Sequence, residues 1–187
     1  VLFDFAGVLT TGRGWFTLAE KLSAQFGLEK KQISDILYEN EAMLMRGRKS
    51  THDFWEENFK KLEIPLDVFK EEFSHWYELN SEVLEIAGEL KKKFRIVIFS
   101  DNFDAVTSTI RADPALKIFD EMFFSNEMHK TKQEEGTFEE VLGKLKLKPK
   151  ECVFIDDKEK NLEPAKALGM ETVLFDGVKS ISKISTR

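Results

Sequence analysis

Four short apolar segments of this sequence each end at polar side chains that can bind a ligand or react. These side chains are Asp4, Ser100, Ser125 and the pair Asp156-Asp157. Carboxylates held close together raise one another's pKa and repel unless a cation offsets their charge. Mg²⁺ suits a site of a few carboxylates and water, and Lys132 could bring a second positive charge. Together these groups suit an anionic substrate, most simply a phosphate.

The apolar segments themselves have the pattern of buried strands in a parallel sheet. They are continuous apolar runs separated by helical periodicity, which is typical of parallel strands covered on both faces. The predicted strands are 1–3, 95–99, 122–124, 152–155 and 172–175. Because the carboxyl ends of parallel strands share one edge, the polar residues should converge there. The sequence therefore predicts an α/β fold with a Rossmann-like parallel sheet and helices on both faces.

Residues 14–80, between the first and second predicted strands, have a different pattern. Apolar residues recur there at helical spacing in four short runs, interrupted at Gly27, Gly47 and Pro65. Four amphipathic helices in succession are typical of a small bundle. We expect an inserted helical-bundle cap at 14–80, which interrupts one α/β core domain made of 1–13 and 81–187. Since the chain opens directly on a strand, we also expect a few leading residues to precede it.

Composition and charge narrow the class of protein further. The net charge of -6 and the pI near 5.3 argue against general nucleic-acid binding. No apolar run reaches the roughly 18 residues of a spanning helix, and no signal-peptide pattern opens the chain, so no membrane partner is expected. The single cysteine, Cys152, cannot form an internal disulfide, which favours a cytoplasmic location. A monomer and a homodimer both fit the sequence.

Four motifs in chain order resemble those of the haloacid dehalogenase-like hydrolase superfamily, in the branch with a helical cap after the first motif. The resemblance covers almost the whole chain and is strongest to phosphatase-type members, such as the N-terminal domain of soluble epoxide hydrolases and bacterial sugar-phosphate phosphatases. The matching segments are Phe3-Asp4-Phe5-Ala6-Gly7-Val8-Leu9; Ile98-Phe99-Ser100; Lys132, with Lys130 as a second candidate; and Val153-Phe154-Ile155-Asp156-Asp157 with Asn161 and Ala165-Lys166-Ala167-Leu168-Gly169-Met170.

This resemblance implies a Mg²⁺-dependent hydrolase that acts on a small phosphorylated substrate. Asp4 would attack phosphorus and form an aspartyl-phosphate. The metal would be held by Asp4, the backbone carbonyl of Ala6 and an acid of the Asp156-Asp157 pair. Ser100 and the residues after it, with Lys132, would bind the phosphoryl oxygens as charge builds.

Three residues depart from the family pattern. Ala6 stands where most phosphatases of the family have a second aspartate, which protonates the leaving group and activates water. General acid–base catalysis typically supplies about 10²–10⁴-fold, so a slow phosphatase or none is expected. Asp101 stands where close relatives have asparagine; either it faces solvent or Asn102 takes over the hydrogen bonding. Gln133 replaces the proline that usually follows Lys132.

Other interpretations of the same residues remain open. A catalytically impaired relative that binds a phosphorylated ligand or a protein partner would also fit Ala6. A third alternative is a phosphonate or haloacid hydrolase, because an Asp-Xaa-Ala-Gly opening resembles phosphonoacetaldehyde hydrolases, which use a cap lysine. Asp156-Asp157 could instead cap the helix near Asn161, and Ser100 could cap the helix that follows it. The histidines, His52, His75 and His129, show no ligand spacing, although His129 is near Lys132.

Overall fold

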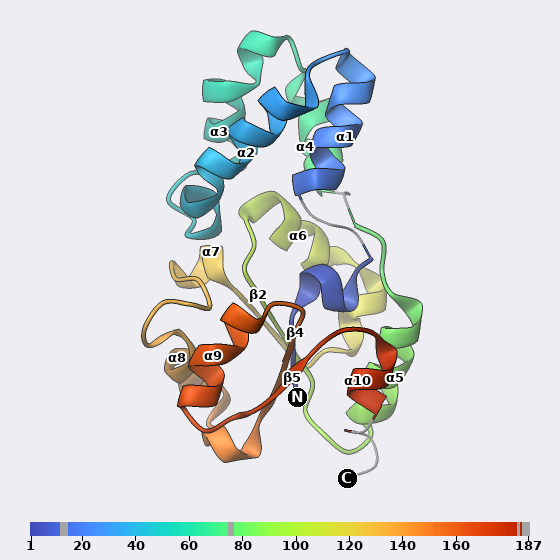
Figure 1. The fold of residues 1–187 in the computed structure, drawn as a ribbon, viewed down its shortest axis with the longest axis vertical. Helices are drawn as coiled ribbons and strands as arrows, with labels where there is room; N and C mark the ends of the chain where they lie inside the picture. Colours follow the sequence, from blue (N-terminus) through green and yellow to red (C-terminus); the bar gives the residue numbers. More distant parts are fainter. Residues whose placement is uncertain (12–14, 75–76, 183, 185–187) are drawn as a thin grey trace.

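A single five-stranded sheet forms the centre of the computed structural model, which describes residues 1–11, 15–74, 77–182 and 184. All strand pairs are parallel, and the order is β3-β2-β1-β4-β5. The chain builds one half outward from β1 to β3 and then returns to β4 beside β1, so the order reverses at the centre (Figure 1). A crevice forms at such a reversal, at the carboxyl ends of the strands. The strands are β1 (Leu2–Phe3), β2 (Val97–Ser100), β3 (Glu121–Phe124), β4 (Val153–Asp156) and β5 (Glu171–Leu174).

Alternate residues along the strands supply two hydrophobic layers. Phe3, Ile98 and Ile155 pack in one layer with helices α5 (Ser81–Lys91), α6 (Asp104–Ala112) and α10 (Val178–Ser182). Leu2, Val97, Phe99 and Phe154 pack in the other with α8 (Thr137–Leu145) and α9 (Glu159–Ala167). Figure 1 shows these two groups of helices on opposite sides of the sheet. The predicted α/β fold, with a Rossmann-like parallel sheet covered on both faces, is therefore confirmed.

Some predicted boundaries are wrong for identifiable reasons. β2 begins at Val97 because the backbone N of Ile96 donates to the Asp120 carboxylate at 2.8 Å instead of to a strand. After β5, residues 178–182 form a further helix, α10, and Ile181 is fully buried in the core. Short connections that periodicity did not indicate are α7 (Ser125–Met128) and the 3₁₀ turns Lys60–Leu62, Pro114–Ile118 and Pro149–Glu151.

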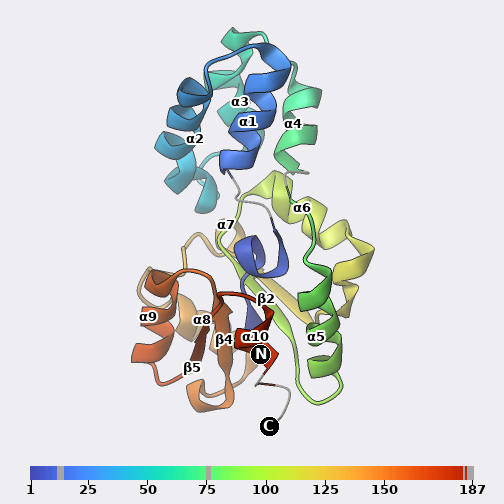
Figure 2. The same cartoon turned by 45° about the vertical axis from the view of Figure 1, so that its right-hand side comes forward.

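Four helices between β1 and β2 form a group that we call the helical insertion: α1 (Trp15–Phe26), α2 (Lys30–Met45), α3 (Thr51–Asn58) and α4 (Leu66–Ser74). They lie together at one end of the molecule, beyond the carboxyl edge of the sheet (Figures 1 and 2). Phe54, Phe59 and Phe69 fill their centre, and all three side chains are fully buried. The segment Ser50-Thr51-His52-Asp53 has the pattern of a helix N-terminus, and Ser50 caps α3, with its Oγ accepting from the backbone N of Asp53 at 3.1 Å.

The chain enters and leaves the helical insertion side by side. Thr10 and Leu79 form an antiparallel bridge, and the backbone N of Asn80 donates to the carbonyl of Leu9 at 2.9 Å. The helical spacing of Phe69, Phe73, Trp76 and Tyr77 in the sequence predicts that all four lie on one helix. α4 ends at Ser74, Tyr77 packs edge-on against Phe5 at 4.8 Å between ring centroids, and Trp76 lies outside the described residues. Among the residues that the structure describes, no helix combines the length and apolar character needed to span a membrane.

Candidate active site

The turn after β1 brings Asp4 to the centre of the carboxyl edge. The backbone N of Asp4 donates to the carbonyl of Ile155 at 2.8 Å, which continues the pairing of β1 with β4. The following turn has Ala6 in an extended conformation and Gly7 at φ 83°. A Cβ atom on Gly7 would lie 2.5 Å from Oδ2 of Asp157. Glycine is therefore needed here both for its φ angle and for the close approach of an acid from the neighbouring strand.

Three carboxylates meet at this edge, as the sequence predicts. Oxygen atoms of Asp4, Asp156 and Asp157 all lie within 4.8 Å of one another. Asp156 is fully buried, and it accepts hydrogen bonds from the backbone N of Lys158 at 2.9 Å and from Nδ2 of Asn161 at 3.0 and 3.1 Å. By contrast, none of the described residues donates a hydrogen bond to the buried Oδ1 of Asp157. Asp156 thus fixes the turn before α9 but does not cap that helix, whose N-cap residue is Lys158.

Lys132 supplies the cation of this cluster. Its Nζ lies 2.5 Å from Oδ1 of Asp4 and 2.7 Å from Oδ2 of Asp156, and its side chain is only 1% exposed. The ammonium group also lies 5.7 and 5.3 Å from the ring centroids of Phe99 and Phe154. These contacts select Lys132 over Lys130, which does not line the cavity described below.

The ionisation of these groups follows from their burial and their crowding. Burial raises the pKa of Asp4 to about 7; the charge of Lys132 opposes this shift, and Asp156 adds to it. Burial alone would lower the pKa of Lys132, but the carboxylates of Asp4, Asp156 and Asp101 outweigh burial and raise it. Burial also raises the pKa of Asp101 and of Asp157. One ammonium group is thus shared by several carboxylates.

This donor set fits a divalent cation. Three carboxylates within ligand distance of one another provide the hard oxygen atoms that Mg²⁺ prefers. The unpartnered Oδ1 of Asp157 is an oxygen for which the described residues supply no hydrogen. Asp4 and the Asp156-Asp157 pair could therefore hold the metal, and Ala6, which lines the same space, could add its backbone carbonyl.

The residues after β2 occupy places that the sequence only partly predicts. Ser100 is fully buried, and its Oγ lies 3.5 Å from the Asp101 carbonyl. Asp101 does not face bulk solvent: it lines the cavity and accepts from the backbone N of Lys132 at 3.0 Å. Asn102 also lines the cavity, and its buried Nδ2 has no partner. Ser125 does not line it, since its hydroxyl accepts from the backbone N of Asn102 at 2.9 Å and so shapes this loop.

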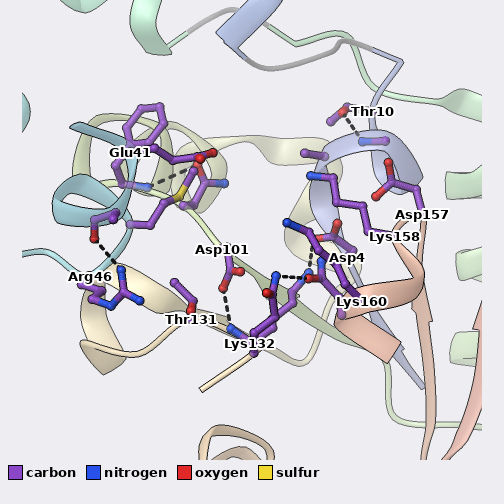
Figure 3. A pocket seen from close by; sticks show the side chains of 18 of the residues that line it. Asp4, Thr10, Glu41, Arg46, Asp101, Thr131, Lys132, Asp157, Lys158 and Lys160 are labelled. Carbon is purple, nitrogen blue, oxygen red and sulfur yellow. Dashed lines mark hydrogen bonds and ion pairs between the residues drawn. The ribbon is translucent and has the colours of Figure 1, made fainter. Parts of the chain in front are cut away.

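A cavity of about 1140 Å³ opens above these groups, between the sheet edge and α2. Figure 3 shows Asp4, Asp157 and Lys158 on one side of it and Glu41 and Arg46 on the other. Sequence reasoning missed this second wall, which α2 supplies through Tyr38, Glu41, Ala42 and Met45, together with Arg46 directly after the helix. These residues have the pattern of an ordinary solvent-facing helix surface, so periodicity could not single them out. It also missed Lys158 and Lys160, which line the first wall.

Neither described histidine lines this cavity. His52 stacks on Trp55, and His129 contacts the carbonyl of Arg46. His75 lies outside the described residues. Gln133, the residue that departs from the usual proline, donates to Oδ1 of Asn161 at 3.0 Å. Because Asn161 in turn donates to Asp156, Gln133 helps to fix the carboxylate cluster.

A comparison with models of known protein families shows the family to which this chain belongs. A model of haloacid dehalogenase-like (HAD-like) hydrolases matches residues 1–169. The chain belongs to this family. The resemblance that the sequence motifs indicate is thereby confirmed, and the match includes the helical insertion and strands β1 to β4.

Two curated relatives are similar to part of this HAD-like hydrolase. Bifunctional epoxide hydrolase 2 of Rattus norvegicus is 36% identical over 102 residues, which make up 51% of this chain and 18% of that protein. The Mus musculus protein of the same name is 33% identical over 108 residues, or 54% of this chain and 20% of that one. The chain thus matches only a minor part of the length of either relative.

Solved structures with the same fold span nearly the whole chain. A HAD family enzyme from Bacteroides thetaiotaomicron, solved as a magnesium complex, matches with a TM-score of 0.80 at 19% identity, covering 100% of this chain and 97% of that one. The same enzyme with magnesium and inorganic phosphate gives 0.74 at 21% identity, covering 91% and 90%. A predicted HAD-like family hydrolase from Porphyromonas gingivalis gives 0.79 at 23% identity, covering 100% and 95%. At these identities the likeness establishes the fold.

Proposed function

We propose that this HAD-like hydrolase is a Mg²⁺-dependent phosphomonoesterase in which Asp4 is the nucleophile. The observation that carries the proposal is the position of Asp4, whose carboxylate lies 2.5 Å from the ammonium of Lys132 at the base of a cavity that also contains Asp157. A buried carboxylate with an adjacent cation is suited to attack an electrophilic centre that carries negative charge. The magnesium complexes solved for a fold relative support the choice of metal.

The residues of this chain would act in two steps. Asp4 would attack phosphorus and form an aspartyl-phosphate as the bond between phosphorus and the ester oxygen breaks, and the alcohol would leave with a proton from solvent. Lys132 and the Nδ2 of Asn102, a buried donor to which no described residue offers an acceptor, would hold the phosphoryl oxygens. Water would then cleave the aspartyl-phosphate. When bound, Mg²⁺ supplies positive charge that lets the anionic nucleophile approach the anionic phosphoryl group.

For the metal ligands, we propose Asp4, the carbonyl of Ala6 and Asp157 as direct partners. Asp157 is the better candidate of the acidic pair because its Oδ1 lacks a hydrogen-bond partner, whereas both oxygens of Asp156 accept hydrogen bonds. Asp156 would then orient Lys132. Ser100 is buried beneath the cavity, so we propose that it acts indirectly, by supporting the backbone of Asp101 and Asn102.

The cavity volume indicates a substrate larger than inorganic phosphate. We propose that the helical insertion, expected at 14–80, acts as a cap on a core made of 1–13 and 81–187, and that α2 contacts the leaving group. Among the described cavity residues, none that the insertion contributes is a lysine. The phosphonate alternative, which depends on a cap lysine, therefore has no support in this wall, and we do not pursue it.

Ala6 limits the rate that we expect. Its methyl group lines the cavity but can neither protonate a leaving group nor activate water. Since a positioned acid–base group typically supplies about 10²–10⁴-fold, hydrolysis should be slow. The same observation favours a second candidate function, in which the chain binds a phosphorylated ligand without turnover.

One assay separates the two functions. Phosphate release from a panel of phosphomonoesters should require Mg²⁺ and should be abolished in Asp4→Asn. Turnover that survives this substitution would contradict the nucleophile assignment. Binding of inorganic phosphate with Mg²⁺ in calorimetry, without turnover of any ester, would favour the binding function. Ala6→Asp should raise hydrolysis, by up to about 10²-fold, and an unchanged rate would argue against a missing acid as the limitation.

A further inference from the structure

Besides the two chain crossings and the packing of α4 against α6, the helical insertion contacts the core through one further segment. The loop between α2 and α3, residues 46–51, lies against α7 and against segments on either side of it in the chain. Figure 1 shows the end of α2 directly beside α7. We call residues 46–51 the docking loop. Its contacts come from three of its residues: Arg46, Gly47 and Thr51.

Arg46 contacts the loop that carries Lys132. Its Nε lies 2.9 Å from Oε2 of Glu134, and its carbonyl lies 3.0 Å from Nδ1 of His129. The same Oε2 of Glu134 accepts from the backbone N and the hydroxyl of Thr131, at 2.8 and 3.0 Å. Since Thr131 directly precedes Lys132, the ion pair joins the insertion to the backbone that presents the buried lysine.

Gly47 allows the closest approach between insertion and core. It has φ 59°, and a Cβ atom there would collide with the carbonyl oxygen of Asn126 in α7. Asn126 cannot easily yield, because its side chain accepts from the hydroxyl of Thr107 in α6 at 2.9 Å. Any side chain at position 47 must therefore push the docking loop away from the core.

Thr51 completes the contact with a cap supplied by the core. Both carboxylate oxygens of Asp104 accept from the backbone N of Thr51, at 3.1 and 3.2 Å, and Asp104 also accepts from its hydroxyl. Thr51 begins α3 and is 2% exposed. A carboxylate at this place satisfies a free N–H group and interacts favourably with the helix dipole. The core thus caps a helix of the insertion.

We propose that the docking loop fixes the insertion over the cavity and, through Arg46 and Glu134, positions the segment that carries Lys132. Arg46, Gly47 and Glu134 are positioning residues in this proposal, because they act through Thr131 and Lys132. The kinetic consequence rests on the proposed function, in which Lys132 holds the phosphoryl group. The structural consequence needs no turnover: releasing the docking loop should also loosen residues 131 and 132.

Amide hydrogen exchange of the full chain, resolved by NMR, tests this consequence. The informative amides are those of Thr51, Thr131 and Lys132, each held by a carboxylate named above. In Arg46→Ala and in Gly47→Ala we expect their exchange to rise about tenfold or more through local opening. The Asn102 amide, which bonds Ser125 within the core, should keep its rate.

Two matched controls separate docking from general loosening. Glu57→Gln removes an ion pair that the docking loop makes inside the insertion, between Lys49 and Glu57. Gly27→Ala changes a glycine with φ 64° that has no atom within 4 Å of its Cβ position, so it shares the backbone strain of Gly47→Ala without the collision. Both controls should leave exchange of Thr131 and Lys132 unchanged.

The remaining variants test the route through Glu134. Arg46→Lys, which keeps the charge, should lie between wild type and Arg46→Ala. The amides of the double variant Arg46→Ala/Glu134→Gln should exchange no faster than those of the faster single variant, because both substitutions remove the same ion pair between Arg46 and Glu134. Unchanged exchange of Thr131 and Lys132 in Arg46→Ala and Gly47→Ala would overturn the proposal, as would equal acceleration in the controls. Failure of the Asp4→Asn assay would overturn the proposed function alone.

Discussion

The two walls of the cavity differ in how their polar groups are held. At the sheet edge, Asp4, Asp156 and Lys132 are buried and tied to one another by contacts of 2.5 to 2.7 Å. On α2, Tyr38 is 57% exposed. A buried charge cluster tolerates little change, because each group is the partner that another needs. An exposed wall can change its residues at small cost in stability. We propose from this difference that the sheet edge determines the reaction and that α2 selects the substrate.

Replacing Lys132 is the most stringent test of this difference between the two walls. In Lys132→Met, Asp4 and Asp156 lose their shared cation while buried, and loss of one partner from a buried pair costs about 3–5 kcal/mol. We expect a decrease of this size in the free energy of unfolding, measured by urea denaturation. Lys144→Met is the control, since Lys144 makes an exposed pair with Glu140 and should cost about 1 kcal/mol or less. Equal decreases in the free energy of unfolding of the two variants would show that the buried charges of the sheet edge are no more sensitive to substitution than an exposed ion pair.

A smaller expected effect comes from Gly7→Ala, which tests the fit between the first turn and Asp157. The added Cβ must displace the Asp157 carboxylate, so we expect Mg²⁺ affinity, measured by calorimetry, to fall about tenfold or more. Gly169→Ala is matched, because Gly169 has φ 88° and open space around its Cβ position. The two variants should share a backbone cost of about 1–2 kcal/mol. Only the first should weaken metal binding; equal affinities would refute the role given to Gly7.

The smallest expected effect on stability is on the α2 wall. Glu41→Gln should change the free energy of unfolding by about 0.5 kcal/mol or less and should shift relative activity among phosphomonoesters that differ in their leaving groups. Glu39→Gln is the control, because Glu39 is exposed on the same helix and does not line the cavity. Identical substrate preferences in the two variants would count against a role for α2 in selecting the leaving group.

Much of the sheet edge could be predicted from the sequence because it depends on local patterns. Continuous apolar runs identify parallel strands, and the carboxyl ends of such strands must meet, so Asp4, Asp156, Asp157 and Lys132 were placed together correctly. Ser125 satisfied the same pattern, yet its hydroxyl bonds the backbone of Asn102. Position at a strand end gives proximity to the edge but does not fix the direction of a side chain.

The contacts of the helical insertion could not be predicted in this way. Arg46 and Glu134 are far apart in the chain, and each is an ordinary charged residue in its own segment. Gly47 could be recognised as the end of a helix, but nothing local indicates that Asn126 lies against it. Such pairings depend on how the helical insertion meets the rest of the chain, and one sequence carries no periodic signal for that.

The two ion pairs of Lys132 have a consequence for how the metal-free chain folds. The chain brings its own counter-ion to a crowded group of acids, so folding need not wait for a divalent ion from solution. A magnesium ion bound as proposed would then exchange with the surroundings while the sheet edge stays assembled. We expect that a molecule synthesised without magnesium folds all the same, and that its thermal unfolding in a chelator is still cooperative.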